Sequence, residues 1–71
     1  PEIFLKAAEK LGVPADECIG IEDAEAGVEA IKSAGMFAVG VGSKDQLAKA
    51  DLLYSNTSDL SLNEIIREYR K

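Results

Sequence analysis

Two adjacent carboxylates, Glu22 and Asp23, are the residues of this chain best placed to do chemistry. They follow the apolar segment Cys18–Ile21, which predicts a short buried strand, and they precede a segment with helical spacing. In open α/β sheets, ligands bind just beyond the carboxyl ends of the strands. Carboxylates are hard oxygen donors that suit Mg²⁺ or Ca²⁺ better than zinc or copper. The pair therefore predicts part of a metal site.

The same residues also allow a purely structural interpretation. Successive side chains of a strand point to opposite faces, so Glu22 and Asp23 cannot both aim at one ion. We expect the shorter and later Asp23 to be the direct metal ligand, and Glu22 to support it. In the alternative, Asp23 only caps the following helix, with Glu25 favourable in its first turn. Gly27 favours the metal site, because a helical glycine costs about 1 kcal/mol relative to alanine and so suggests close packing nearby.

The composition excludes several classes of function. The 71 residues allow at most one small domain, and the net charge of −5 argues against nucleic acid and anionic membranes as partners. The absence of histidine excludes Ser-His and Cys-His catalysis and histidine metal ligands within these residues. Cys18 is the only cysteine, and we expect a buried thiol. The single cysteine cannot form an internal disulfide, and we expect a cytoplasmic location. No apolar run approaches the roughly 18 residues of a membrane span, and no signal-peptide pattern is present.

The elements that must position the carboxylates alternate between helix and strand. We expect helices at 1–11, beginning at Pro1, at 24–34, at 43–50 and around 62–69, and strands at 18–21, 36–41 and 51–55. This alternation predicts an α/β fold in which right-handed crossovers join three short parallel strands and helices cover the sheet. Three strands with a helix at each end indicate one edge of a larger doubly wound domain.

Local signals refine these elements. Ser43 and Gln46, and again Ser61 and Glu64, have the spacing of a capping box, so we expect a capped helix after each pair. The polar residues 57–59 are expected to form a turn. Helical spacing also predicts apolar faces. These faces comprise Ile3, Phe4, Ala7, Ala8 and Leu11 in the first helix, Ala24, Val28, Ile31 and Ala34 in the second, and Leu62, Ile65, Ile66 and Tyr69 in the last.

Several segments resemble the C-terminal part of haloacid dehalogenase superfamily enzymes. They are PEIF at 1–4, LGV at 11–13, IEDAEAG at 21–27, AGM at 34–36 and GVG at 40–42. The resemblance implies a Rossmann-like core whose acidic motif holds Mg²⁺, with Asp23 as the direct ligand and Glu22 as the supporting carboxylate. Pro1 matches the last proline of the family's lysine motif, which implies that the phosphate-binding lysine lies just before this segment.

The resemblance also implies what the chain belongs to. Residues 1–71 correspond to the C-terminal segment of the core domain, while the nucleophile-bearing N-terminal strand and the cap are absent. The tail at 50–52 and 57–60 is most similar to family members that interconvert β-glucose 1-phosphate and glucose 6-phosphate through an aspartyl-phosphate. We therefore expect a fragment of an Mg²⁺-dependent phosphomutase that acts on a sugar phosphate and is inactive alone. A related sugar-phosphate phosphatase, a receiver-like signalling module and a structural piece without activity are the alternatives.

The resemblance further predicts an open sheet edge. In the family, the strand at Cys18–Ile21 pairs with the first strand, which is missing here. No lysine or proline within this strand blocks its edge. We therefore expect the isolated chain either to be poorly folded or to associate through this edge with another copy or with a complementing N-terminal segment.

Overall fold

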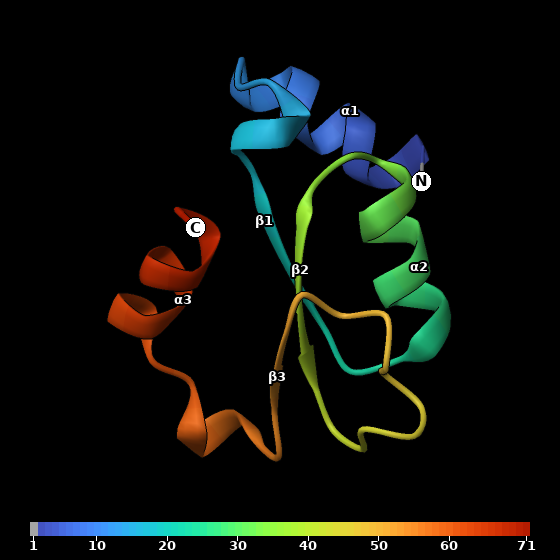
Figure 1. Ribbon diagram of the computed structural model, residues 1–71. Coiled ribbons are helices and arrows are strands. Elements are labelled where there is room, and N and C mark those ends of the chain that lie inside the picture. The colour runs from blue at the N-terminus through green and yellow to red at the C-terminus, as the bar shows by residue number, and fades with distance from the viewer. Residues whose placement is uncertain (1) are drawn as a thin grey trace.

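A three-stranded parallel sheet forms the centre of the computed structural model, which describes residues 2–71 (Figure 1). Its strands are β1 (Ile19–Glu22), β2 (Phe37–Val41) and β3 (Leu52–Tyr54), in the order β1-β2-β3. Ile19 lies opposite Phe37, and Val39 lies opposite Leu52. The predicted α/β fold with three short parallel strands is confirmed, whereas the predicted helix start at Pro1 lies outside the described residues.

Helices lie on both faces of the sheet. The three α-helices are α1 (Glu2–Leu11), α2 (Glu25–Ser33) and α3 (Leu62–Tyr69), and two short 3₁₀ helices are η1 (Ala15–Glu17) and η2 (Thr57–Asp59). Figure 1 shows α2 and α3 on opposite sides of the sheet. The carboxyl ends of all three strands lie together at the lower end of the sheet in this view. Any side chain that follows a strand therefore lies near that end.

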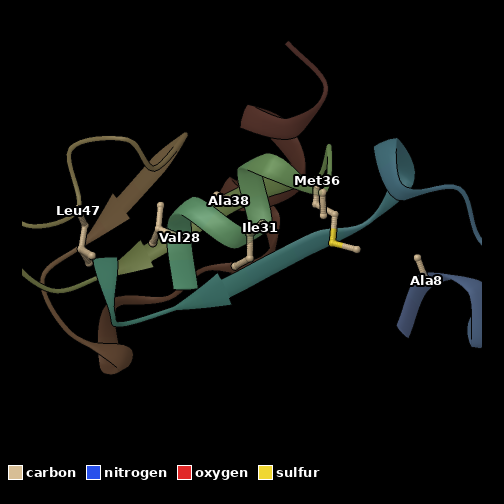
Figure 2. Packing of buried hydrophobic residues seen from close by; sticks show 7 residues of the cluster. Ala8, Val28, Ile31, Met36, Ala38 and Leu47 are labelled. Carbon is tan, nitrogen blue, oxygen red and sulfur yellow. The ribbon is translucent and has the colours of Figure 1, made fainter. Parts of the chain in front are cut away.

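Each face of the sheet carries its own hydrophobic cluster. Figure 2 shows the cluster beside α2, whose buried members are Ala8, Val28, Ile31, Ala34, Met36, Ala38 and Leu47. The cluster beside α3 consists of Val39, Tyr54 and Ile65. Successive side chains of a strand point to opposite faces, so Ala38 and Val39, both 0% exposed, belong to different clusters. Burial on both faces explains why β2 is apolar without interruption.

Both helices on the α2 side end at a glycine with positive φ. The φ angle is 70° at Gly12, after α1, and 83° at Gly35, after α2. Glycine lacks the Cβ that would crowd the backbone in this conformation. After Gly35 the amide of Met36 donates to the carbonyl of Ile31 at 3.2 Å, and the chain turns directly into β2.

The predicted helix at 43–50 is wrong. The Ser43 hydroxyl accepts from the amide of Asp45 at 3.2 Å, whereas the amide of Gln46 donates to the Ser43 carbonyl. The amide of Leu47 also donates to the Ser43 carbonyl, and the amide of Ala50 donates to that of Leu47, which makes isolated turns. No run of bonds from each amide to the carbonyl four residues earlier follows that of Leu47, so these turns do not continue as a helix.

The second predicted capping box is half formed. The Ser61 hydroxyl accepts from the amide of Glu64 at 3.2 Å, as a helix cap does. The Glu64 carboxylate does not reach back to Ser61, because it accepts from the Tyr54 hydroxyl at 2.5 Å. The expected polar turn at 57–59 is η2, which the Asn56 side chain caps by accepting from the amide of Ser58 at 2.9 Å.

Several residues expected to be buried are not. Ile3 and Leu11 of α1 are 75% and 74% exposed, and Leu62 of α3 is 70% exposed. Ala24 is exposed because it is the N-cap residue of α2 and precedes the first full turn. Cys18 is a half-buried thiol whose Sγ donates to the carbonyl of Pro14 at 3.5 Å. Helical spacing identifies a shared face, but only contact with another element buries it.

Candidate functional site

The predicted carboxylates line an open pocket at the carboxyl end of the sheet. Its volume is about 240 Å³. The lining residues are Ile21, Glu22, Asp23, Val41 and Thr57. They come from the end of β1, the end of β2 and the segment after β3, which is the end of the sheet where α/β proteins bind ligands.

The Glu22 carboxylate is engaged with the backbone that begins α2. Its Oε1 accepts from the amide of Asp23 at 2.9 Å and from the amide of Ala24 at 3.3 Å. Ala24 is the N-cap residue and has no side-chain cap bond. The alternative in which Asp23 caps α2 is therefore wrong, because the carboxylate at this helix start is that of Glu22.

The Asp23 carboxylate is exposed and reaches the pocket. Among residues 2–71, neither a hydrogen bond nor an ion pair engages its oxygen atoms. An uncommitted carboxylate at a strand end suits Mg²⁺, which prefers oxygen ligands and is usually held by one or two carboxylates with several waters retained. The described residues contain no group of three or more Asp, Glu, Cys or His side chains that could hold a metal ion. The pair therefore fits one corner of a Mg²⁺ site, and its assignment as metal ligands stays a prediction.

Two glycines allow the close packing expected near this site. At Gly27, in α2, a Cβ would overlap the side chain of Glu22, which packs against the helix at this position. At Gly20, in β1, a Cβ would overlap the side chain of Ile31 in α2, which is 0% exposed. Both glycines therefore let α2 approach the strand that carries the carboxylates.

Among the described residues, the pocket has one polar lining residue, Thr57, beyond the two predicted carboxylates. Thr57 begins η2, and its sequence predicts only a polar turn. The sequence signal for Thr57 is weaker than that for Asp23, because Thr57 lies three residues beyond the end of β3, whereas Asp23 follows β1 directly.

No helix within residues 2–71 combines the length and the apolar composition needed to cross a membrane.

Comparison with known proteins identifies relatives of this segment. A family model described as haloacid dehalogenase-like hydrolase matches residues 1–35. The chain is 54% identical over all 71 residues to the β-phosphoglucomutase of Bacillus subtilis, of which it spans 31%. It is 44% identical over 41 residues, or 58% of the chain, to the fructose-1-phosphate phosphatase of Escherichia coli, of which the matched part is 22%.

A solved structure agrees with these sequence relatives. The crystal structure of the β-phosphoglucomutase of Clostridium difficile superposes with a TM-score of 0.96 at 50% sequence identity. The match covers 99% of this chain and 31% of that protein. The chain thus spans about a third of the length of both β-phosphoglucomutases, and the fold is that of the corresponding third.

Proposed function

The chain belongs to the haloacid dehalogenase superfamily, and we propose that it supplies part of the Mg²⁺ site of a phosphomutase. The proposed reaction interconverts β-glucose 1-phosphate and glucose 6-phosphate through an aspartyl-phosphate. The 54% identity to a β-phosphoglucomutase over the whole chain is the observation that supports this substrate. The uncommitted Asp23 carboxylate at the pocket supports the metal-binding role. A cytoplasmic location belongs to the same proposal, because the free thiol Cys18 suits a reducing compartment.

Each carboxylate has a separate part in this proposal. Asp23 would bind the ion directly, and Glu22 would hold the backbone of Asp23 in place through its two hydrogen bonds to the amides of Asp23 and Ala24. A bound Mg²⁺ neutralises charge on a phosphoryl group and orients it, which is most of what phosphoryl transfer requires. The described residues supply only part of such a metal site. We propose that the nucleophilic aspartate, the phosphate-binding lysine and the cap lie elsewhere in the complete protein. Residues 1–71 alone are accordingly proposed to be an inactive C-terminal part of the core domain.

A sugar-phosphate phosphatase is the second candidate. The 44% identity to the fructose-1-phosphate phosphatase of E. coli favours it, although that match covers 58% of the chain. The proposed metal-binding residues, Asp23 and Glu22, would serve both reactions equally. The two differ in whether the phosphoryl group returns to a sugar or passes to water.

Parallel product assays on the complete protein that carries this segment separate the two candidates. With β-glucose 1-phosphate and Mg²⁺, the mutase forms glucose 6-phosphate while inorganic phosphate stays near the background. The phosphatase releases phosphate as fast as substrate disappears, which would overturn the mutase proposal. Asp23→Asn is the matched control, since it keeps the shape of the side chain and removes its charge. Full activity of that variant would overturn the metal-binding role.

A further inference from the structure

We propose that Gly27 is a positioning residue for Asp23 and acts through the side chain of Glu22. Its relation to Mg²⁺ rests on the proposed function, whereas its relation to Asp23 rests on geometry alone. The three atoms nearest to a Cβ at position 27 are the Cγ, Cδ and Oε2 atoms of Glu22. Glu22 therefore occupies the space that a side chain at position 27 would need.

The position that Glu22 takes there restrains the backbone of Asp23 on both sides. The amide of Asp23 belongs to the peptide group before its Cα, and the amide of Ala24 belongs to the peptide group after it. Glu22 Oε1 accepts from both, at 2.9 and 3.3 Å. Because one carboxylate binds both peptide groups, the backbone from which the Asp23 side chain projects toward the pocket is restrained.

A methyl group at position 27 would displace Glu22 before it displaced the helix. The overlapping atoms belong to a flexible side chain and not to the backbone. Glu22 would rotate away, and the amides of Asp23 and Ala24 would lose their shared acceptor. A glycine with no such role would behave differently, because alanine is the better helix former and would simply stabilise α2.

A double-mutant cycle on the complete protein without Mg²⁺ tests the coupling of the two residues. Its members are the unchanged protein, Gly27→Ala, Glu22→Ala and the double variant. In the Glu22→Ala background, Gly27→Ala is expected to raise Tm by about 2–4 °C, because only the helix preference remains. In the unchanged background the same substitution raises Tm less or lowers it. Equal shifts in both backgrounds overturn the proposal.

The amide proton signals of Asp23 and Ala24 give a readout that a merely structural glycine would not change. Amide protons bonded to a carboxylate resonate downfield, so Gly27→Ala is expected to move both signals upfield, as Glu22→Ala does. Ala26→Gly is the matched control, since it alters helix preference at the neighbouring exposed position of α2. It is expected to lower Tm and to leave both amide signals in place. Unmoved signals in Gly27→Ala contradict the proposal.

Mg²⁺ titration by calorimetry separates this inference from the proposed function. Gly27→Ala is expected to weaken Mg²⁺ binding by about 10–100-fold, and to weaken it no further once Glu22 is alanine. If Mg²⁺ binding depends on Asp23 but the coupling between Gly27 and Glu22 is absent, this inference fails alone. If the coupling is present but Asp23→Ala leaves Mg²⁺ affinity unchanged, the metal site fails while the positioning of Asp23 by Gly27 stands.

Discussion

Glu22 and Asp23 are neighbours in sequence whose carboxylates have different surroundings. Glu22 Oε1 is bound to two backbone amides, while Asp23 is exposed at the pocket. The alternation of side chains along a strand separates them, and the start of α2 gives only Glu22 a set of hydrogen-bond donors. The two carboxylates should therefore respond differently to substitution.

Removing Asp23 should cost more than neutralising Glu22. In the complete protein, Asp23→Ala is expected to abolish Mg²⁺-dependent phosphoryl transfer, because it removes the proposed ligand. Glu22→Gln keeps an oxygen that can accept from both amides, so its loss should stay at or below the about 10–100-fold typical of supporting residues. Activity and calorimetric Mg²⁺ affinity measure both effects. Unchanged values for both variants would remove the two residues from the site.

Asp51 joins three elements through one carboxylate. Its Oδ2 accepts from the amide of Ala38 at 2.8 Å, and its Oδ1 receives the Lys32 ammonium of α2 at 2.7 Å. Its own amide donates to the Ala38 carbonyl at 2.8 Å. The regular pairing of β2 with β3 begins one residue later, at Val39, so Asp51 extends that pairing with its side chain.

Loss of the Asp51 side chain should destabilise the protein more than loss of its ion pair. Asp51→Ala leaves the amide of the fully buried Ala38 without an acceptor, which costs about 1–3 kcal/mol. Lys32→Ala is the control, because it removes only a partly exposed ion pair worth up to about 1 kcal/mol. Urea unfolding of both variants measures the difference. Equal losses would show that the bond to Ala38 contributes little.

At the scale of elements, local signals predicted the long helices and the strands but not the segment between β2 and β3. Gly12 and Gly35 end helices through a positive φ that glycine adopts without any tertiary contact, so the sequence is sufficient to predict these helix ends. The Ser43 hydroxyl accepts from Asp45 as a helix cap could, but the chain forms turns there and not a helix before it reaches β3. Glu64 had a local partner in the expected capping box, but the Tyr54 hydroxyl of β3 takes its carboxylate.

The candidate site also contains residues that the sequence predicts and features that depend on the fold. Glu22 and Asp23 could be predicted because a strand end and a helix start are visible in one short segment. Thr57 reaches the same pocket from 34 positions beyond Asp23 in the sequence, so only the sheet order brings the two together. The bonds of Glu22 to two amides could not be predicted either, since they depend on its rotamer over Gly27.

The contact between Tyr54 and Glu64 should make the docking of α3 on β3 sensitive to alkaline pH. Burial, and next the hydrogen bond to the Glu64 carboxylate, raise the pKa of Tyr54 above its ordinary value. A group whose folded pKa is raised stabilises the fold fully below its unfolded pKa, about 10 for tyrosine, and loses that contribution as pH rises through the folded pKa. Unfolding free energies measured between pH 8 and about 11 should therefore fall at the alkaline end. Tyr54→Phe should flatten this part of the profile, and an unchanged slope would contradict the assignment.

At the scale of the whole molecule, β1 forms an edge of the sheet, and its outward backbone groups pair with no other strand within residues 2–71. Within residues 2–71, β1 pairs only with β2. The carbonyl of Cys18, just before β1, accepts from the amide of Phe37 in β2 at 3.2 Å, where the pairing of the two strands begins. Backbone groups alternate in direction along a strand, so Gly20 also faces β2, while Ile19 and Ile21 direct theirs to the open edge. Ile21 is 52% exposed beside that edge.

An open edge with an exposed apolar side chain should recruit another strand. Hydrogen exchange of the 71-residue chain is expected to show a protected Gly20 amide, because it faces β2, and rapidly exchanging Ile19 and Ile21 amides when sedimentation shows a monomer. Raising the concentration should protect Ile19 and Ile21 together with a rise in sedimentation coefficient, since the second strand supplies their acceptors. Ile21→Lys is the matched control, because a charged side chain on an edge strand opposes pairing while leaving the backbone groups intact. That variant should stay monomeric with both amides unprotected. Protected Ile19 and Ile21 amides in a proven monomer would mean that a segment of the chain itself covers the edge.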